Sequence, residues 1–274
     1  MVSSLAIVLP AYNEEVRLGP ALDELFAYLC DTPRMAPVRV LVVDDGSTDA
    51  TAAIVKARPE YVEDGAEASE VLSDCPTLEL LSIAHGGKGC AVKAGMLAAD
   101  ADLILFADAD MATPPDQLPK LVVALETADI ALGSRIQPDG SDMRATQPPF
   151  RRLVGRLFRF AAQLWVTGPV RDTQCGFKGF RRQVAHDLFS RLRITSIVFD
   201  VDLIYLARKR GYRIAIVPIT WADRRGSRMH ARPKLALRVA WDLVRIRFIH
   251  RNVHRKAPVE APVVESPAKG APGR

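Results

Sequence analysis

Two aspartates one residue apart, Asp108 and Asp110, follow the apolar run Leu103–Ala107. The run is typical of a buried strand, and the carboxylates come where that strand should stop. Side chains at i and i+2 of an extended segment point the same way, so both carboxylates can face one point. Their repulsion needs a cation, and hard oxygen ligands suit Mg²⁺ or Mn²⁺, with phosphate oxygens as further ligands. The pattern predicts a metal and diphosphate site; the alternative is a solvated turn.

Three more apolar runs precede this one, and each is also followed by a polar loop. Strands are expected at 5–9, 38–43, 78–83 and 102–107, followed by "AYNEE", "DDGSTD", "HGGKG" and "DADMATP", with helices at about 21–30, 50–57 and 90–99. This alternation predicts an α/β fold with a mostly parallel sheet flanked by helices. Parallel sheets bind ligands at the carboxyl ends of their strands. The four loops are therefore expected to form one ligand-binding rim, where Lys88 at a helix start suits an anion.

The composition is that of a globular protein. Of 274 residues, 49% are hydrophobic and 25% charged, which excludes disorder for most of the chain. The first residues lack a basic n-region, and no apolar run reaches the roughly 18 residues that span a membrane. We therefore expect no signal peptide and no spanning helix, so that the chain stays on the cytoplasmic side. Contact with a membrane surface remains open.

Positive charge gathers near the C-terminus. From Arg224 to Lys256 there are eleven Lys or Arg and one acid, Asp242, which indicates an anionic partner such as nucleic acid, phospholipid or a phosphorylated substrate. Residues 232–256 predict a basic amphipathic helix at a membrane interface, after a domain of residues 1–231, and 257–274 have the composition of a disordered tail. Arg151–Val166 repeats the amphipathic pattern. The alternative is that both helices pack on the sheet and their arginines are only solvated.

The order of motifs resembles that of family 2 glycosyltransferases of the GT-A fold, which is Rossmann-like. Within them it resembles the polyprenyl-phosphate hexosyltransferases, and among those the dolichyl-phosphate β-glucosyltransferases. The motifs are "VLPAYNEE", "VVDDGSTDAT", "GGKGCAVKAGM", "LFADADMATP", "LGSR", "RDTQCGFKGF", "FDVDL" and a Trp followed by "GSR" at 221–228. The resemblance implies that residues 1–231 form a catalytic domain. It also implies an inverting, metal-dependent transfer of glucose from UDP-glucose to a polyprenyl phosphate by a peripheral enzyme on the cytoplasmic face of a membrane.

The same resemblance implies roles for individual residues. Arg135 and Arg152 match arginines that grip phosphate, and Asp172 matches a proposed catalytic carboxylate. A lipid phosphate is largely ionised at neutral pH, so we expect Asp172 to position Arg171 or a sugar hydroxyl rather than to accept a proton. Asp108 and Asp110 would hold the metal. The residues expected to bind the nucleotide sugar are Pro10, Tyr12, Glu14, Asp44, Asp45, Lys88, Asp108, Ala109, Asp110 and Arg228.

Four positions depart from the family pattern. Ala112 stands where some mannosyl relatives have Gln as a metal ligand, which water would replace here. His85 replaces an Asn in the glycine loop, Asp202 replaces a longer Glu, and Arg228 replaces a Lys. The contacts of those side chains must therefore be rebuilt in this chain.

Three other functions remain to be weighed. The first is transfer of mannose from GDP-mannose to the same lipid, because nothing in the nucleoside loops separates uracil from guanine. The second is nucleic-acid binding through the basic segment, but this leaves the rim loops unexplained and no aromatic ladder accompanies the charges. The third is a sugar-nucleotide binder without catalysis, which the intact Asp108, Asp110, Arg135 and Asp172 disfavour. The sequence does not indicate an oligomeric state.

Overall fold

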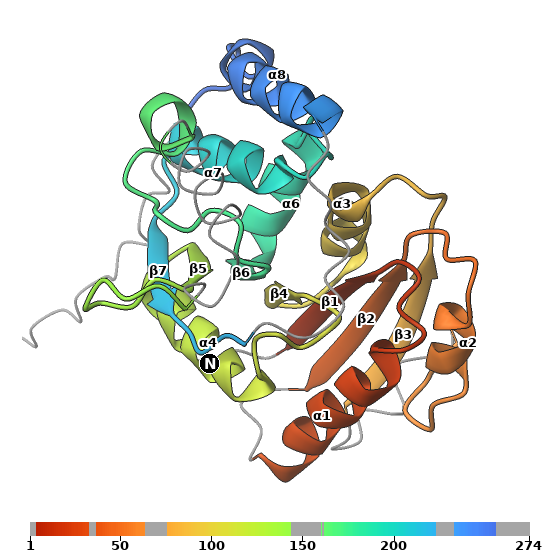
Figure 1. Cartoon of the computed structure of the whole chain (residues 1–274). Helices are drawn as coiled ribbons and strands as arrows, with labels where there is room; N and C mark the ends of the chain where they lie inside the picture. The colour runs from red at the N-terminus through yellow and green to blue at the C-terminus, as the bar shows by residue number, and fades with distance from the viewer. Residues whose placement is uncertain are drawn as a thin grey trace, which may run out of the picture.

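The computed structural model describes residues 4–32, 37–63, 76–143, 160, 162–222 and 233–255. A seven-stranded sheet, in the order β3-β2-β1-β4-β6-β5-β7, lies between helices on both faces (Figure 1). The strands are β1 (Leu5–Ala11), β2 (Val38–Asp44), β3 (Thr77–Ser82), β4 (Leu103–Ala107), β5 (Ile130–Ser134), β6 (Phe177–Arg181) and β7 (Ile214–Pro218). The helices are α1 (Leu18–Asp31), α2 (Thr51–Lys56), α3 (Lys88–Ala98), α4 (Leu118–Thr127), α6 (Arg182–Arg191), α7 (Phe199–Arg210) and α8 (Pro233–Ile249), with short turns η1 (Pro115–Gln117) and η3 (Gln163–Thr167).

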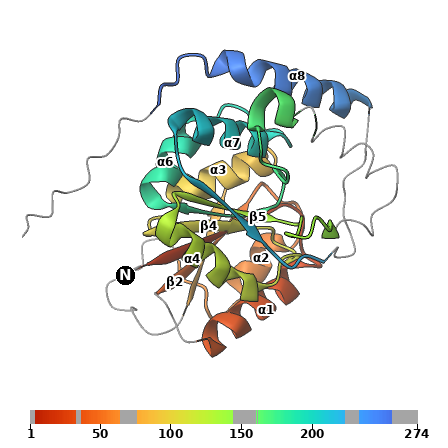
Figure 2. The same cartoon turned by 90° about the vertical axis from the view of Figure 1, so that its left-hand side faces the viewer.

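Alternate residues of β1 face opposite halves of the core. Ile7 and Leu9 pack with α1, α2 and α4, whereas Ala6 and Val8 pack with α3, α6 and α7. Both sides of the strand are buried, as its continuous apolar run predicts. Figure 2 shows α1, α2 and α4 on one side of the sheet and α3, α6 and α7 on the other. The predicted α/β fold with a mostly parallel sheet is confirmed.

The strand order reverses direction between β1 and β4. The chain runs from β1 outward to β2 and β3, then returns to add β4 on the other side of β1, and all four strands are parallel. Chain connections therefore leave β1 and β4 in opposite directions, and open parallel sheets generally bind ligands at such a point, at the carboxyl ends of the strands. The predicted strands are confirmed to within two residues, but the helix expected at 90–99 begins at Lys88. Lys88 thus lies in the first turn of α3.

Strand β6 runs antiparallel between β4 and β5, which the sequence did not predict. Ala107 pairs with Phe177, so Gly176 comes to lie beside Asp108. Directly inside this edge, the ammonium of Lys178 is fully buried and pairs with Asp200 of α7 at 2.6 Å. Lys178 also donates to the carbonyl oxygen of Cys175. The buried pair therefore holds the backbone that leads into Gly176.

Replacing Lys178 by Met should lower the free energy of unfolding by about 3–5 kcal/mol, because it leaves Asp200 buried without its counter-charge. Burial raises the pKa of Asp200, and Lys178 and Lys88 oppose that rise. The double change of Lys178 to Met and Asp200 to Leu should recover part of the loss, as measured by urea denaturation. Arg39→Met, in the half-exposed Arg39–Glu79 pair, is the control and should cost less than about 1 kcal/mol. A double variant no more stable than the single one would contradict this.

Helix α8 forms an outer layer over α7 (Figure 2). Leu243 and Ile246 of α8 pack with Val166 of η3 and Val201 of α7 in a small separate cluster. Buried polar contacts fix the same helix: His250 Nε2 lies 2.6 Å from Oδ1 of Asp202, and the hydroxyl of Ser196 donates to Asp242 at 2.6 Å. In the part of the chain that the structure describes, no helix has the length and apolar character needed to cross a bilayer.

Candidate active site

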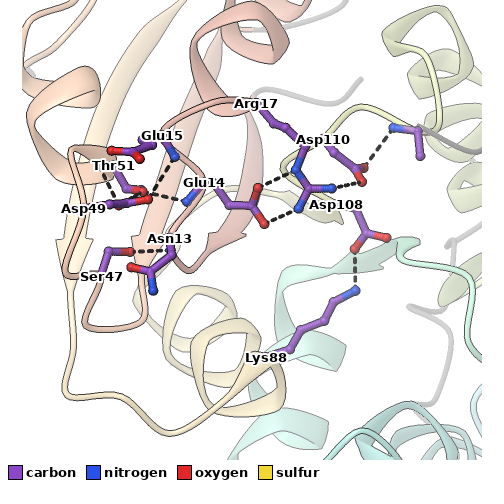
Figure 3. Close-up of polar contacts among 11 residues, drawn as sticks. Asn13, Glu14, Glu15, Arg17, Ser47, Asp49, Thr51, Lys88, Asp108 and Asp110 are labelled. Carbon is purple, nitrogen blue, oxygen red and sulfur yellow. Dashed lines mark hydrogen bonds and ion pairs between the residues drawn. The ribbon is translucent and has the colours of Figure 1, made fainter. Parts of the chain in front are cut away.

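The first two rim loops are tied together by the polar residues of their motifs. Asn13, in the left-handed region with φ of 53°, donates its backbone N–H to the Ser47 hydroxyl at 2.9 Å and accepts from the Thr48 N–H at 2.8 Å. The backbone N–H of Glu14 donates to the Thr51 hydroxyl at 2.8 Å. Figure 3 shows the contacts of Asn13 with Ser47 and of Glu14 with Thr51. Much of "YNEE" and "GSTDAT" therefore shapes the rim.

Asp108 and Asp110 lie in a turn after β4. The Met111 N–H donates to the Asp108 carbonyl at 3.1 Å, and Met111 has a φ of 47°. The expectation of an extended Asp-x-Asp segment was therefore wrong, because the strand already ends at Ala107. Both carboxylates nevertheless lie near one another on the rim, as Figure 3 shows. The turn, rather than the pleat, brings them together.

The carboxylate of Asp108 rests directly on the backbone of Gly176. A Cβ at position 176 would collide with both Asp108 carboxylate oxygens. Only glycine leaves the Asp108 carboxylate in this position; any side chain at 176 would push it aside. The glycine in "DTQCGFK" is thus explained by the antiparallel neighbour of β4, a contact the sequence did not reveal.

Each of the two aspartates is paired with a basic side chain from another rim loop. Nζ of Lys88 lies 2.5 Å from Oδ1 of Asp108, and Nη1 of Arg17 lies 3.2 Å from Oδ2 of Asp110 (Figure 3). The Glu14 carboxylate binds the other edge of the Arg17 guanidinium. It accepts hydrogen bonds from Nε at 2.7 Å and from Nη2 at 2.5 Å. Hydrogen bonding to Glu14 raises the pKa of Arg17 against the opposing effect of burial, and the charges of Asp110 and Asp108 add to the rise. Arg17 was not predicted as a site residue.

The residues at this rim fit a divalent cation. Asp108 and Asp110 offer hard carboxylate oxygens, and Oδ2 of Asp108 accepts no hydrogen bond from the described residues. Three or more metal-ligating side chains do not converge anywhere in the described part of the chain. A Mg²⁺ ion is commonly held by one or two carboxylates together with substrate phosphates, and two aspartates meet that need.

Tyr12 and His85 form a stacked aromatic pair between the first and third rim loops. Their ring centroids are 4.1 Å apart, and both side chains are partly exposed. Asp45 holds the third loop in place, because its two oxygens accept the N–H groups of Gly86 and Gly87 at 2.8 Å each. Asp45 is almost fully buried. The expected contacts of Asp45 and Tyr12 with the nucleotide sugar stay predictions.

Arg135 and Asp172 are brought together at the end of β5. The Arg135 guanidinium makes two parallel hydrogen bonds to Asp172, at 2.9 and 2.7 Å, and its backbone N–H makes a third at 2.9 Å. The guanidinium also lies 5.6 Å from the ring centroid of Trp221. Burial opposes the charge on Arg135, but the paired Asp172 outweighs it and raises the pKa of the guanidinium. Asp172 thus orients Arg135, whereas the resemblance had implied Arg171 or a sugar hydroxyl as the group it positions.

The other residues predicted to bind the substrates lie at the ends of strands, in the turn between the two aspartates, or outside the described residues. Pro10 lies in β1 and Asp44 ends β2, where its carboxylate accepts the Ser47 N–H at 3.1 Å. Ala109 is buried in the turn between the two aspartates. Arg152 and Arg228 lie outside the described residues, as do most of Arg151–Val166 and the predicted tail.

Comparisons with known proteins agree on one family. The sequence pattern described as Glycosyl transferase family 2 matches residues 6–189. The dolichyl-phosphate beta-glucosyltransferase of Drosophila melanogaster is 39% identical over 236 residues, which are 82% of this chain and 69% of that protein. The human protein of the same name is 34% identical over the same shares.

Solved structures agree on the fold. Glucosyl-3-phosphoglycerate synthase from Mycobacterium tuberculosis, in complex with UDP, superposes with a TM-score of 0.62 over 90% of this chain and 80% of that one, at 20% identity. That enzyme has also been solved with Mn²⁺ and UDP-glucose, at a TM-score of 0.56 over 89% of this chain and 78% of that one. At this identity the likeness concerns the GT-A fold alone. From its motifs, its sheet and its relatives, the chain belongs to glycosyl transferase family 2.

Proposed function

We propose that this protein transfers glucose from UDP-glucose to a polyprenyl phosphate of the dolichyl type, with inversion at the sugar carbon and release of UDP. The names of its relatives supply the transferred sugar and the acceptor, and the resemblance in sequence supplies UDP as the carrier of the sugar. The observation that carries the proposal is the convergence of Asp108 and Asp110 with the Arg135–Asp172 pair at one end of the sheet. The charge of Asp108 is close enough to raise the pKa of Arg135 further.

The groups at the rim match the demands of this transfer. The acceptor phosphate is already ionised, so the main task is to stabilise the charge that develops on the leaving diphosphate. Asp108 and Asp110 would hold Mg²⁺ or Mn²⁺, which supplies positive charge to that diphosphate. Nη1 of Arg135 has no hydrogen bond to the described residues and is available to a phosphate oxygen, while Asp172 fixes the orientation of the guanidinium.

Calorimetric titration with UDP and GDP in the presence of Mn²⁺ tests the donor. UDP should bind at least about tenfold more tightly than GDP, and UDP-glucose should donate to a short prenyl phosphate. Preference for GDP, with transfer from GDP-mannose, would instead support the mannosyl alternative. Binding of neither nucleotide would overturn the proposal.

A membrane is the proposed source of the lipid, and one exposed apolar surface fits it. On α8, Trp241 and Phe248 are 64% and 65% exposed, and Leu164 of η3 is 77% exposed. The two elements meet where the Arg247 guanidinium lies 4.7 Å from the ring centroid of Trp165. Apolar side chains interleaved with arginines are typical of a surface that lies in the interface of an anionic bilayer. We therefore infer a peripheral enzyme bound through α8 and η3, on the cytoplasmic face.

Changing Arg238, Arg247 and Arg251 together to Gln should release the protein from anionic liposomes while leaving UDP affinity unchanged. All three are exposed, and each basic residue near an anionic surface contributes on the order of 1 kcal/mol. Arg245 is left in place because it pairs at 3.0 Å with the buried Asp242. Co-sedimentation measures binding; Arg191→Gln, on α6, is the control. Absence of liposome binding by the unaltered protein at low salt would show that these arginines are only solvated.

A further inference from the structure

The guanidinium of Arg17 bridges two rim loops at the predicted metal site. It reaches from the start of α1 to Asp110 after β4, while Glu14 holds its other edge (Figure 3). Both oxygens of Asp110 are thereby engaged: Oδ2 accepts from Arg17, and Oδ1 accepts the Ala112 N–H at 3.1 Å. A divalent cation that uses Oδ2 of Asp110 therefore shares that oxygen with the guanidinium and is repelled by its positive charge.

The two contacts of Arg17 differ in strength. Glu14 makes two hydrogen bonds, at 2.7 and 2.5 Å, whereas Asp110 makes a single one at 3.2 Å. Two short, charge-assisted bonds hold more firmly than one long one. When the contact with Asp110 breaks, Glu14 keeps the guanidinium beside the site. There it can turn to a diphosphate, whose oxygens suit its planar fork.

We propose that Arg17 competes with the divalent cation for Asp110 until a nucleoside diphosphate draws it away, and that it thereby couples metal binding to nucleotide binding. The proposal rests on the proposed function in one respect, that the site takes a cation and a diphosphate. Without nucleotide, the guanidinium competes for Oδ2 of Asp110 and its charge repels the cation. With nucleotide, both obstacles are removed, so the cation binds more tightly.

Titration with Mn²⁺, followed by the electron paramagnetic resonance signal of the free ion, tests this without measuring activity. Without nucleotide, Arg17→Gln should bind Mn²⁺ about five- to tenfold more tightly than the unaltered protein, since a cation competing at Asp110 has been removed. The factor by which UDP tightens Mn²⁺ binding should shrink correspondingly. Arg17→Lys, which keeps the charge, should stay closer to the unaltered protein, and Arg39→Gln, on the outer strands, should not differ from it.

Unchanged, weaker or unmeasurable Mn²⁺ binding by folded Arg17→Gln without nucleotide would overturn the proposal. An undiminished UDP effect in that variant would do the same. If GDP rather than UDP tightens Mn²⁺ binding to the unaltered protein, the donor assignment is wrong. The coupling proposal is then tested with GDP, whose effect on Mn²⁺ binding should shrink in Arg17→Gln.

Discussion

Replacing Asp110 by Asn should abolish glucose transfer and remove most metal-dependent binding of UDP. The change keeps the shape of the side chain and its hydrogen bond from Ala112 but deletes the charge that a divalent cation needs. Metal stabilisation of a leaving diphosphate is worth several kcal/mol, so the rate should fall by at least roughly 10³-fold. Transfer to a short prenyl phosphate and Mn²⁺-dependent UDP titration measure the two effects. Asp108→Asn should act in the same direction.

Two further variants distinguish the loss of the metal site from a general loss of structure. Asp116→Asn, on the exposed acid of η1, should keep full activity. Gly176→Ala leaves both aspartates in the sequence but pushes a methyl group into the Asp108 carboxylate, so it should also lose metal-dependent UDP binding. Near-normal turnover of Asp110→Asn with Mg²⁺ present would show that the metal site lies elsewhere.

Separating Arg135 from Asp172 should lower kcat by about 10²- to 10³-fold, more than it raises KM. The half-buried guanidinium is expected to meet the diphosphate as negative charge develops, and loss of one such donor costs that much in other enzymes. Arg135→Lys keeps the charge but loses the two parallel hydrogen bonds. Asp172→Asn keeps the size of the side chain but removes the negative charge that balances the Arg135 guanidinium. Steady-state kinetics on both variants and on their combination measure the effect.

The combination distinguishes a shared role from two separate ones. If Arg135 and Asp172 act as a unit, the double variant should be little worse than the worse single variant. Thermal unfolding supplies the structural control, because a folded variant with a lowered kcat has lost more than stability. A pH–rate profile of the unaltered protein that is flat near pH 7 would agree with a positioning role for Asp172, whereas a fall with a single pKa there would favour proton transfer. Multiplicative single effects would contradict the paired role.

The sequence by itself determined the half of the sheet that contains strands β1 to β4. Strands β1 to β4 are continuous apolar runs because both of their faces are buried, and that pattern is local and readable. The polar loops that follow them share one rim because parallel strands end at the same edge. The sequence therefore indicated Asp108, Asp110 and Lys88 as rim residues. Its amphipathic pattern also indicated the exposed apolar stripe of α8. Division into residues 1–231, 232–256 and 257–274 stays a prediction.

Only the tertiary structure decided which of these residues meet. The insertion of β6 beside β4 brings Gly176 to Asp108 across 68 positions of sequence, and no local pattern encodes that pairing. The contact of Arg17 with Asp110 spans 93 positions and that of Asp202 with His250 spans 48. An arginine after "NEE" looks in sequence like an ordinary solvated charge, and the acid in "FDVDL" shows a change of length but not its partner. Their roles depend on long-range strand order and helix packing, which set distances that periodicity and composition do not contain.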